Sequence, residues 1–338
     1  MNNSAAQIGL GVQGDLPMDR YAHIGKAAEA AGFDTLAVFA DVWFLPPIVP
    51  LTVIATHTEH IRLGPSCLNP YTLGPSEIIG QVAALDAVSG GRAFLGLTRG
   101  AWLDGVGISQ ARPLALLRDV LELFPRMLAD DRSGYQGSVL TIAPGQHLQY
   151  PVPRNRIPIM VGTWSPRLSA LAGELADEVK IGASASPAMA AKVRDWIVPG
   201  AEKAGRDPGE VGVVVGAVTV VDDDGEQARR RARTQVARYL NVVGAMDSTA
   251  VVSAELVAEV DAELAAGRVE AAGDLVPDEV LDAFAFAGTP EQVADHALAC
   301  YAAGATRVEF NSPYTMDGTL DLLADKVLPL IRAGLAVG

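Results

Sequence analysis

The chain has 338 residues, of which 49% are hydrophobic, and it carries a formal net charge of −14. Duplex nucleic acid is bound through clustered Lys and Arg side chains, so this acidic balance argues against a nucleic-acid partner. An uncharged apolar run of about 18 residues is absent, which argues against a membrane span. The 2 cysteines form no disulfide framework, which indicates a reducing, cytoplasmic location.

Short apolar runs alternate with amphipathic segments, and this alternation predicts strands that are each followed by a helix. The predicted strands are 7–13, 34–40, 60–68, 92–97, 157–163, 178–183, 211–221 and 305–311. The predicted helices are 17–31, 47–57, 75–89, 112–128, 165–175, 187–204 and 317–334. Uninterrupted apolar strands are typical of a parallel sheet covered by helices. These units predict a (β/α)8 TIM barrel, with a doubly wound sheet as the alternative.

Two segments depart from this alternation. Residues 133–150 are Gly-rich and alternating, which predicts a hairpin. Residues 222–288 are rich in Ala, Glu and Arg and too long for an ordinary connection, so they predict a helical insertion after strand seven, as a lid or an interface. Since no linker divides the chain, we expect residues 1–338 to form a single domain.

In a barrel of this kind, chemistry gathers at the carboxyl ends of the strands. Trp43, Trp102 and Trp164 follow strands two, four and five. Aromatic side chains that meet at one end of a barrel suit a flat, conjugated ligand, although they could equally be packing residues. No metal-binding motif is found, so no metal site is predicted and an organic cofactor would have to carry the chemistry.

Four further residues each have two interpretations. Asp41 follows a buried strand and could contact a ligand or cap the next helix. Arg99 could pair with an anionic ligand or with Asp41. Cys67 could be a reactive thiol or a small buried filler, and the filler is the more frequent role of such a residue. Glu309 could point into the mouth of the barrel or form a salt bridge in its wall.

The region of strands three and four contains the segment LGPSCLNPY, a helix that ends in LDAVSGGR and a strand that runs into TRG, all within residues 62–102. In these motifs the chain resembles the bacterial luciferase-like superfamily. This pattern is closest to the branch of the coenzyme F420-dependent methylenetetrahydromethanopterin reductases. Residues 34–41, 157–179 and 286–313 match as well, so the resemblance covers nearly the whole chain apart from about 222–284.

The resemblance implies a (β/α)8 barrel with a flavin or deazaflavin at its mouth, and a non-proline cis peptide between Ser66 and Cys67. It implies that the helix start near Ser165 holds a phosphate. The implied cofactor-binding residues are Asp41, Val42, Ser66, Cys67, Asn69, Thr98, Arg99, Gly100, Gly162, Thr163, Trp164 and Ser165. The expected substrate-binding residues are Trp43, Trp102 and Tyr314, and the expected catalytic residues are Asp41 and Glu309.

One departure from the family pattern concerns the proton donor. Several relatives have Asp-His after strand two, where this chain has Asp41-Val42. The proton must therefore come from Asp41, Glu309 or Tyr314, unless the chemistry needs none.

Three functions are compatible with this sequence. The first is a coenzyme F420-dependent oxidoreductase that transfers a hydride to or from a C=C, C=N or alcohol carbon of a small substrate, and the TRG and NPY segments favour it. The second is an FMN-dependent two-component monooxygenase that receives reduced flavin from a partner reductase. The third is a non-catalytic flavin-binding relative. A homodimer is expected because it is common in this superfamily.

Overall fold

The computed structural model describes residues 6–312 and 318–337, and it divides into two compact units. Within the described residues, the first unit comprises Gly11–Lys180 and Trp196–Val211. The second comprises residues 6–10, then Ile181–Asp195 and the described residues from Gly212 onward. The division passes through strands β1 (Gln7–Val12) and β8 (Glu178–Gly182) and through helix α6 (Pro187–Lys203). We describe each unit by itself.

The first unit is built from strands that alternate with helices. Its elements after β1 are α1 (Met18–Ala31), β2 (Thr35–Phe39), α2 (Ile48–Ala55), β3 (Arg62–Ser66), α3 (Pro75–Val88), β4 (Leu95–Thr98), α4 (Pro113–Leu128), β5 (Tyr135–Gln136), β6 (Thr141–Ile142), β7 (Ile159–Gly162), α5 (Pro166–Leu175) and β8. Short 3-10 turns lie at Asp104–Val106 and Pro208–Glu210. The pairs β2–β3, β4–β7 and β7–β8 are parallel, and two parallel bridges join β3 to the β4 segment.

These strands form because consecutive residues are buried on both of their faces. Leu36, Ala37 and Val38 of β2 are all fully buried, and burying an aliphatic side chain of this size contributes about 1.5–3 kcal/mol. Two glycines let β3 and β4 approach closely. A Cβ atom on Gly64 would lie 2.3 Å from the Phe94 carbonyl oxygen, and one on Gly96 would lie 2.0 Å from that of Pro65. This close approach places the ends of β3 and β4 side by side.

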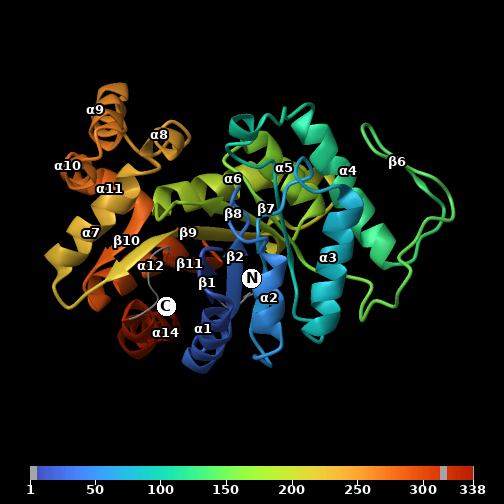
Figure 1. Cartoon of the computed structure of the whole chain (residues 1–338), viewed down its shortest axis with the longest axis horizontal. Coiled ribbons are helices and arrows are strands. Elements are labelled where there is room, and N and C mark those ends of the chain that lie inside the picture. Colours follow the sequence, from blue (N-terminus) through green and yellow to red (C-terminus); the bar gives the residue numbers. More distant parts are fainter. Residues whose placement is uncertain (1–5, 313–317, 338) are drawn as a thin grey trace. The chain divides into compact units, whose positions relative to one another are not determined.

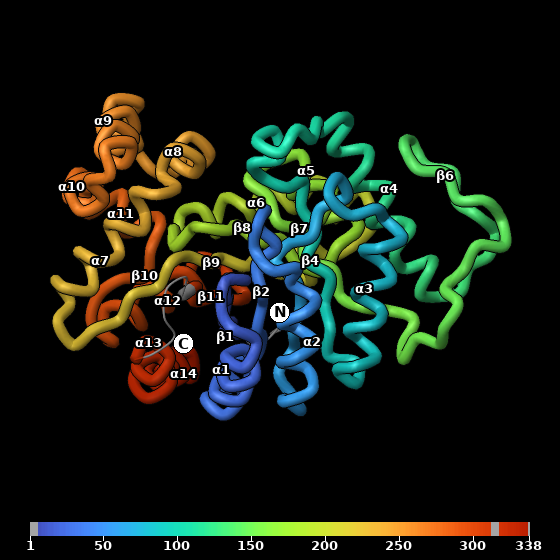
Figure 2. The backbone as a smooth tube through the Cα atoms, viewed as in Figure 1, coloured from blue at the N-terminus to red at the C-terminus, as the bar shows by residue number. Residues whose placement is uncertain are grey.

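The predicted hairpin is present between α4 and β7. Strands β5 and β6 pair antiparallel, and Figure 2 shows the segment as an open green loop beyond α4. Its anchor is the buried carboxylate of Asp119 on α4, which accepts hydrogen bonds from the backbone N–H groups of Ser138 (3.0 Å), Val139 (2.6 Å) and Leu140 (2.8 Å). These hydrogen bonds stabilise the hairpin, whose two short strands cannot form an extended ladder of hydrogen bonds between them.

The second unit carries β9 and the insertion that follows it. Its elements are β9 (Gly212–Val221), α7 (Gly225–Ala237), α8 (Leu240–Val243), α9 (Ala254–Ala265), α10 (Val269–Asp274), α11 (Asp278–Phe284), β10 (Ala285–Gly288), α12 (Pro290–Ala302), β11 (Arg307–Ser312), α13 (Thr319–Leu322), a π-turn at Leu323–Val327 and α14 (Leu328–Val337). Helices α8 to α11 gather beside α7, drawn in orange in Figure 1.

The prediction that 222–288 is helical throughout is wrong at its end. Residues Ala285–Gly288 form β10, which pairs parallel with β9 so that Phe286 lies opposite Thr219. The Phe286 ring also contacts the rings of Phe310 and His296, with centroid distances of 5.4 and 5.0 Å. Ala-rich composition favours a helix locally, but pairing with Val218–Val221 of β9 and these aromatic contacts favour the strand.

All eight predicted strands occur in the described part of the chain, as β1, β2, β3, β4, β7, β8, β9 and β11. Each of the helices in that part is too short or too polar to traverse a lipid bilayer.

Candidate functional site

A cluster of polar side chains lies at the carboxyl ends of β1, β2 and β3 in the first unit. Directly after β1, Gln13 donates a hydrogen bond from Nε2 to Oδ2 of Asp41, at 3.0 Å. Its other amide atom, Oε1, accepts a hydrogen bond from the N–H of Gly14 at 3.3 Å. Because both ends of the amide are engaged, its donor is held toward the Asp41 carboxyl group.

Lys180 reaches the same cluster from β8, and sequence reasoning missed it. Its side chain is only 3% exposed, and its Nζ donates a hydrogen bond to Ser66 Oγ at 2.9 Å. The ammonium nitrogen lies 5.4 Å from the centre of the Phe39 ring. Phe39 and Ser66 are partners in the β2–β3 register and are the last residues of their strands. A lone lysine in an apolar strand was the available signal, since a lysine is almost never fully buried without a partner.

The pKa of Asp41 is raised above its ordinary value of 3.8. Burial is the largest cause, because it disfavours the charged form, while the hydrogen bond from Gln13 and the attraction of Lys180 act in the opposite direction. A carboxyl group so poised at a strand end can hold and release a proton closer to neutral pH, which is typical of functional sites.

The peptide bond between Ser66 and Cys67 is cis, as the family resemblance implied. Beyond it, the Cys67 thiol packs against two glycines. A Cβ atom on Gly162 would lie 2.9 Å from Cys67 Sγ, and one on Gly96 would lie 3.2 Å from it. The residue is half-buried and its thiol occupies space that these glycines leave open, so its surroundings favour the interpretation of a small filler over that of a reactive thiol.

Thr98 and Arg99, which end and follow β4, form hydrogen bonds with Gly162 and Gln110. Thr98 Oγ1 donates a hydrogen bond to the carbonyl oxygen of Gly162 at 2.9 Å. Arg99 is exposed and donates from Nε to Gln110 Oε1 at 2.9 Å, and Gln110 Nε2 donates back to the Arg99 carbonyl at 2.7 Å. The alternative in which Arg99 pairs with Asp41 is therefore wrong, since Lys180 is the cation that acts on Asp41.

The loop after β3 is shaped by Asn69. Its Oδ1 accepts hydrogen bonds from the N–H groups of Tyr71 (3.1 Å) and Thr72 (3.0 Å), which turns the chain. Gly100 has φ of +89°, and a Cβ atom on it would lie 3.0 Å from Asn69 Cγ. The side chain of Asn69 is thus engaged with its own loop, and its predicted contact with a cofactor stays a prediction.

The start of α5 lies after β7. The Thr163 N–H donates to the Lys180 carbonyl oxygen at 2.9 Å, and the Ser165 N–H donates to Thr163 Oγ1 at 2.9 Å. Ser165 is exposed, and Trp164 and Gly162 are half-buried. The proximity of Thr163 to Lys180 connects this helix start with the polar cluster, while the predicted phosphate contact stays a prediction.

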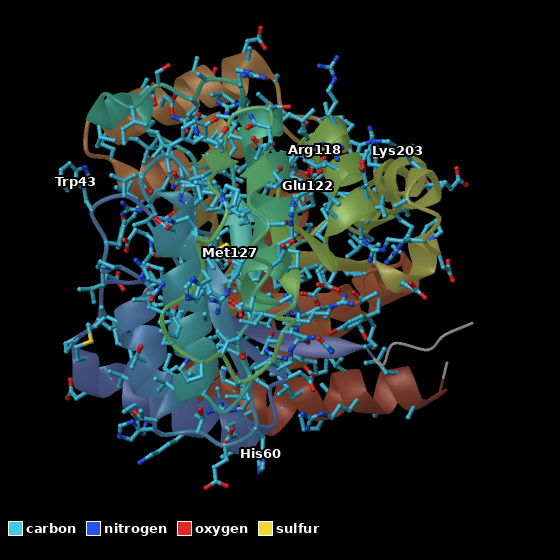
Figure 3. The ribbon with its side chains drawn as sticks, turned by 90° about the vertical axis from the view of Figure 1, so that its right-hand side faces the viewer. Trp43, His60, Arg118, Glu122, Met127 and Lys203 are labelled. Carbon is cyan, nitrogen blue, oxygen red and sulfur yellow. The ribbon has the colours of Figure 1, made fainter. Side chains whose placement is uncertain are left out.

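Two of the predicted substrate-contacting tryptophans are open to solvent. Trp43 is 90% exposed and Trp102 is 55% exposed. Both have positive φ, 70° and 55°, a backbone region that bulky residues rarely adopt. Figure 3 shows Trp43 projecting outward from the ribbon. Val42, beside it, is half-buried. Exposed aromatic rings at strand ends remain available to an aromatic or apolar substrate.

In the second unit, polar residues alternate with apolar ones along β11. Arg307, Glu309 and Asn311 are buried on one face, while Phe310 packs against Phe286 on the other. Glu309 lies within the strand opposite Gly216, where an added Cβ atom would lie 3.1 Å from the Glu309 Cβ. At the carboxyl end, the Oδ1 atom of Asn311 is buried without a hydrogen-bond partner among the described residues. Tyr314 lies outside the described residues.

The sequence places Glu309 and Asn311 together near the end of the last strand, but only Glu309 was predicted to have a catalytic role. Through the described ranges, no three His, Cys, Asp or Glu side chains gather as metal ligands would.

Comparison with known proteins identifies the family of this chain. The model of the luciferase-like monooxygenase family matches residues 4–307. The chain belongs to the luciferase-like monooxygenase family. A 5,10-methylenetetrahydromethanopterin reductase from Methanolobus tindarius is 31% identical over 303 residues, which cover 88% of this chain and 91% of the relative. A reductase of the same name from Archaeoglobus fulgidus is 29% identical, with 91% and 94% of the two chains covered.

The solved structure of a coenzyme F420-dependent tetrahydromethanopterin reductase from Methanopyrus kandleri is similar to this chain throughout. Its TM-score is 0.87 at 25% identity, and the match covers 96% of this chain and 99% of that one. The predicted (β/α)8 barrel class and the predicted family are thereby confirmed.

Proposed function

We propose that this chain is a coenzyme F420-dependent oxidoreductase that transfers a hydride between the deazaflavin and a C=C, C=N or alcohol carbon of a small organic substrate. Its support is the similarity to reductases of this kind over most of both chains. The structural observation that carries the proposal is the Asp41 carboxyl group, which Gln13 orients and whose pKa is raised by burial at a strand end.

The residues present fit a deazaflavin cofactor. Ser66, the last residue of β3, would lie against its ring, near the backbone of Gly162 and Thr163 at the end of β7. Separately, within the second unit, Asn311 Oδ1 has no hydrogen-bond partner among the described residues and is an acceptor that suits an N–H donor of a ligand. Val42, Cys67, Asn69, Thr98, Arg99, Gly100, Trp164 and Ser165 complete the proposed binding set.

When bound, coenzyme F420 supplies or accepts the hydride at its ring carbon. Reduction of a C=N or C=C bond also needs one proton, so that hydride and proton together add two hydrogens. We assign this proton to Asp41, which delivers it from its carboxyl group to the substrate atom next to the hydride acceptor. In alcohol oxidation, Asp41 accepts the hydroxyl proton instead. Trp43 and Trp102 would bind the substrate and exclude water from it.

The alternative is an FMN-dependent monooxygenase supplied with reduced flavin by a partner reductase. The description of the matched family, luciferase-like monooxygenase, favours it. The two candidates differ in cofactor and in oxygen consumption. A homodimer and a cytoplasmic location are proposed from the sequence alone, the dimer from the family resemblance and the location from the cysteine content.

The deciding experiment is a titration of the purified protein with coenzyme F420 and, in parallel, with FMN, followed by ligand fluorescence. Tight binding of coenzyme F420 supports the proposal, and preference for FMN with oxygen uptake supports the monooxygenase. Binding of either without turnover supports the non-catalytic relative. The variant Ser66→Trp should abolish binding by filling the space beside the ring. Ser133→Trp, on the exposed hairpin, is the matched control that should bind normally.

A further inference from the structure

We propose that Gln110 is a positioning residue that closes the loop from Arg99 to Ala111 and so presents Trp102, just beyond the end of β4, to a flat apolar part of the substrate. The substrate role of Trp102 rests on the proposed function. The closure of the loop rests on hydrogen bonds within the first unit.

Both ends of the Gln110 amide close the base of this loop. Its Nε2 donates hydrogen bonds to the carbonyl oxygens of Arg99 at 2.7 Å and of Gly100 at 3.0 Å. Its Oε1 accepts a hydrogen bond from Arg99 Nε at 2.9 Å. Two of these bonds reach the main chain, so Gln110 holds the ends of the loop together although it lies 11 positions after Arg99. A compact loop whose ends meet in this way is an Ω-loop, a kind of segment that often carries function.

A second contact and a buried side chain order the rest of the loop. The carbonyl oxygen of Ala111 accepts a hydrogen bond from the Tyr71 hydroxyl at 2.9 Å, which ties the loop to the one after β3. Leu103 is only 2% exposed, and its carbonyl oxygen accepts a hydrogen bond from the Ile108 N–H at 2.9 Å. Because Leu103 is buried while its neighbour Trp102 is open to solvent, the loop has an inner and an outer side, and Trp102 lies on the outer one.

Trp102 has the features of a ring that is presented to a ligand rather than packed. Its φ of 55° lies in the left-handed region, which a bulky residue occupies only where the surrounding structure enforces it. The residue nevertheless stays 55% exposed, so burial of the ring compensates for this strain only in part. The closed loop enforces the conformation, and a ligand that stacks on the ring would bury it. The substrate class that fits has a flat, apolar part beside the carbon that gains or loses the hydride.

The first test measures the closure of the loop without cofactor, by hydrogen exchange of the peptide that contains Gly107 and Ile108. The N–H groups of both residues donate hydrogen bonds to carbonyl oxygens inside the loop. In Gln110→Met they should exchange about tenfold faster than in the wild type, while the strands and the melting temperature stay unchanged, because the loop opens locally. Gln146→Met, exposed on the hairpin, is the matched control and should exchange as the wild type does.

Two further variants show which hydrogen bonds matter. Gln110→Glu keeps the acceptor for the Arg99 side chain but loses both donors to the carbonyl oxygens, so its loop should exchange as fast as that of Gln110→Met. If Gln110→Met does not fold, Gln110→Glu replaces it. Arg99→Ala removes only the bond to Oε1 and should exchange as the wild type does. The closure by Gln110 is refuted if its variants exchange at the wild-type rate, or if Arg99→Ala exchanges as fast as they do.

The second test measures ligand binding at Trp102 with 2-naphthol, a neutral and flat aromatic probe, by equilibrium dialysis with and without coenzyme F420. The affinity should fall about tenfold in Trp102→Ala and in Gln110→Met, at an unchanged melting temperature, and should persist in Gln146→Met. A merely structural role of Gln110 would leave the affinity unaltered. The ligand role of Trp102 is overturned if the wild type binds no 2-naphthol, or if all four proteins bind it alike.

The proposed function and the role of Gln110 fail in different ways. Should the wild type bind no coenzyme F420, the proposed function fails, while hydrogen exchange and 2-naphthol binding by the cofactor-free protein still decide the role of Gln110. If coenzyme F420 binds but Gln110→Met changes neither the exchange nor the affinity for 2-naphthol, the proposed function stands and the role of Gln110 fails.

Discussion

Gln13 donates a hydrogen bond to Asp41 across 3.0 Å, and so joins the first residue after β1 to the second residue after β2. The bond orients the carboxyl group and lowers its pKa, while burial raises it by more. Because burial has the larger effect, we expect the change in melting temperature on substituting Asp41 to depend on pH.

We expect Asp41→Asn to raise the melting temperature at pH 8 and to change it little at pH 4. The pKa of Asp41 is higher in the folded than in the unfolded protein, so ionisation of Asp41 destabilises the folded state. Stability is therefore greatest below the unfolded pKa and falls as pH rises through the folded pKa. The Asp41→Asn variant cannot ionise at this position and so avoids this loss. Turnover should fall about 10²–10⁴-fold, which is the usual effect of removing a general acid. Asp295→Asn, exposed on α12, is the control. An Asp41→Asn effect that grows toward acid would contradict the sign.

Glu174 on α5 should stabilise the first unit in neutral but not in strongly acidic solution. Arg118 on α4 donates two hydrogen bonds to it, at 2.8 and 2.7 Å, and Lys203 on α6 donates a third at 3.0 Å. These hydrogen bonds, of which those from Arg118 have the largest effect, lower the pKa of Glu174 from 4.5 to about 2. The two cations and Glu122, a second partner of Arg118, are labelled in Figure 3.

Glu174→Gln should therefore reduce the free energy of unfolding by about 1 kcal/mol at pH 7, since the pair is bidentate and partly buried. Folded Glu174 has the lower pKa, so its contribution is present above the unfolded pKa of 4.5 and is lost as pH falls through about 2. Urea unfolding at pH 7, 4 and 2.5 measures this decline. Glu202→Gln, exposed on α6, should show none of it. A constant difference between Glu174→Gln and wild type at all three pH values would refute the assignment.

Gly162→Ala should destabilise the protein by about 1–3 kcal/mol, because the new methyl group would lie 2.9 Å from Cys67 Sγ in a packed interior. It should also weaken cofactor binding, since the displaced thiol belongs to the proposed binding set. Cys67→Ala removes the sulfur and should restore part of the loss in the double variant. Denaturant unfolding of both single variants and the double variant measures this coupling. Strictly additive effects would show that the two residues do not compete for space.

Asn311→Leu should leave the protein equally stable or more stable while weakening ligand binding. Its Oδ1 is buried without a partner among the described residues, and an apolar side chain of similar volume removes that cost. A ligand N–H that needs this acceptor would lose it. Thermal melts and fluorescence titration of the same sample separate the two effects. Asn241→Leu, exposed on α8, is the control for added apolar surface. Lower stability with unchanged affinity would show that Asn311 serves packing alone.

The sequence was sufficient for the eight strands, because alternation between buried strands and amphipathic helices is a local pattern. It was insufficient for β10, whose Ala-rich sequence prefers a helix until the carboxyl-terminal part of β9 offers it hydrogen bonds. For the site, the strand-end rule selected Asp41 and Ser66. It overlooked Lys180, whose role depends on which atoms meet, and of the two partners that it offered for Arg99, an anionic ligand or Asp41, the structure contradicts Asp41.

By itself, then, the sequence determined the succession of elements, the hairpin and the family. These depend on residue periodicity and on motifs in which neighbours in the chain act together. The tertiary structure decided that Lys180 meets Ser66, 114 residues away, and that Cys67 fills the space left by Gly96 and Gly162. Such contacts arise from strand register and the volumes of facing side chains, which no local pattern encodes.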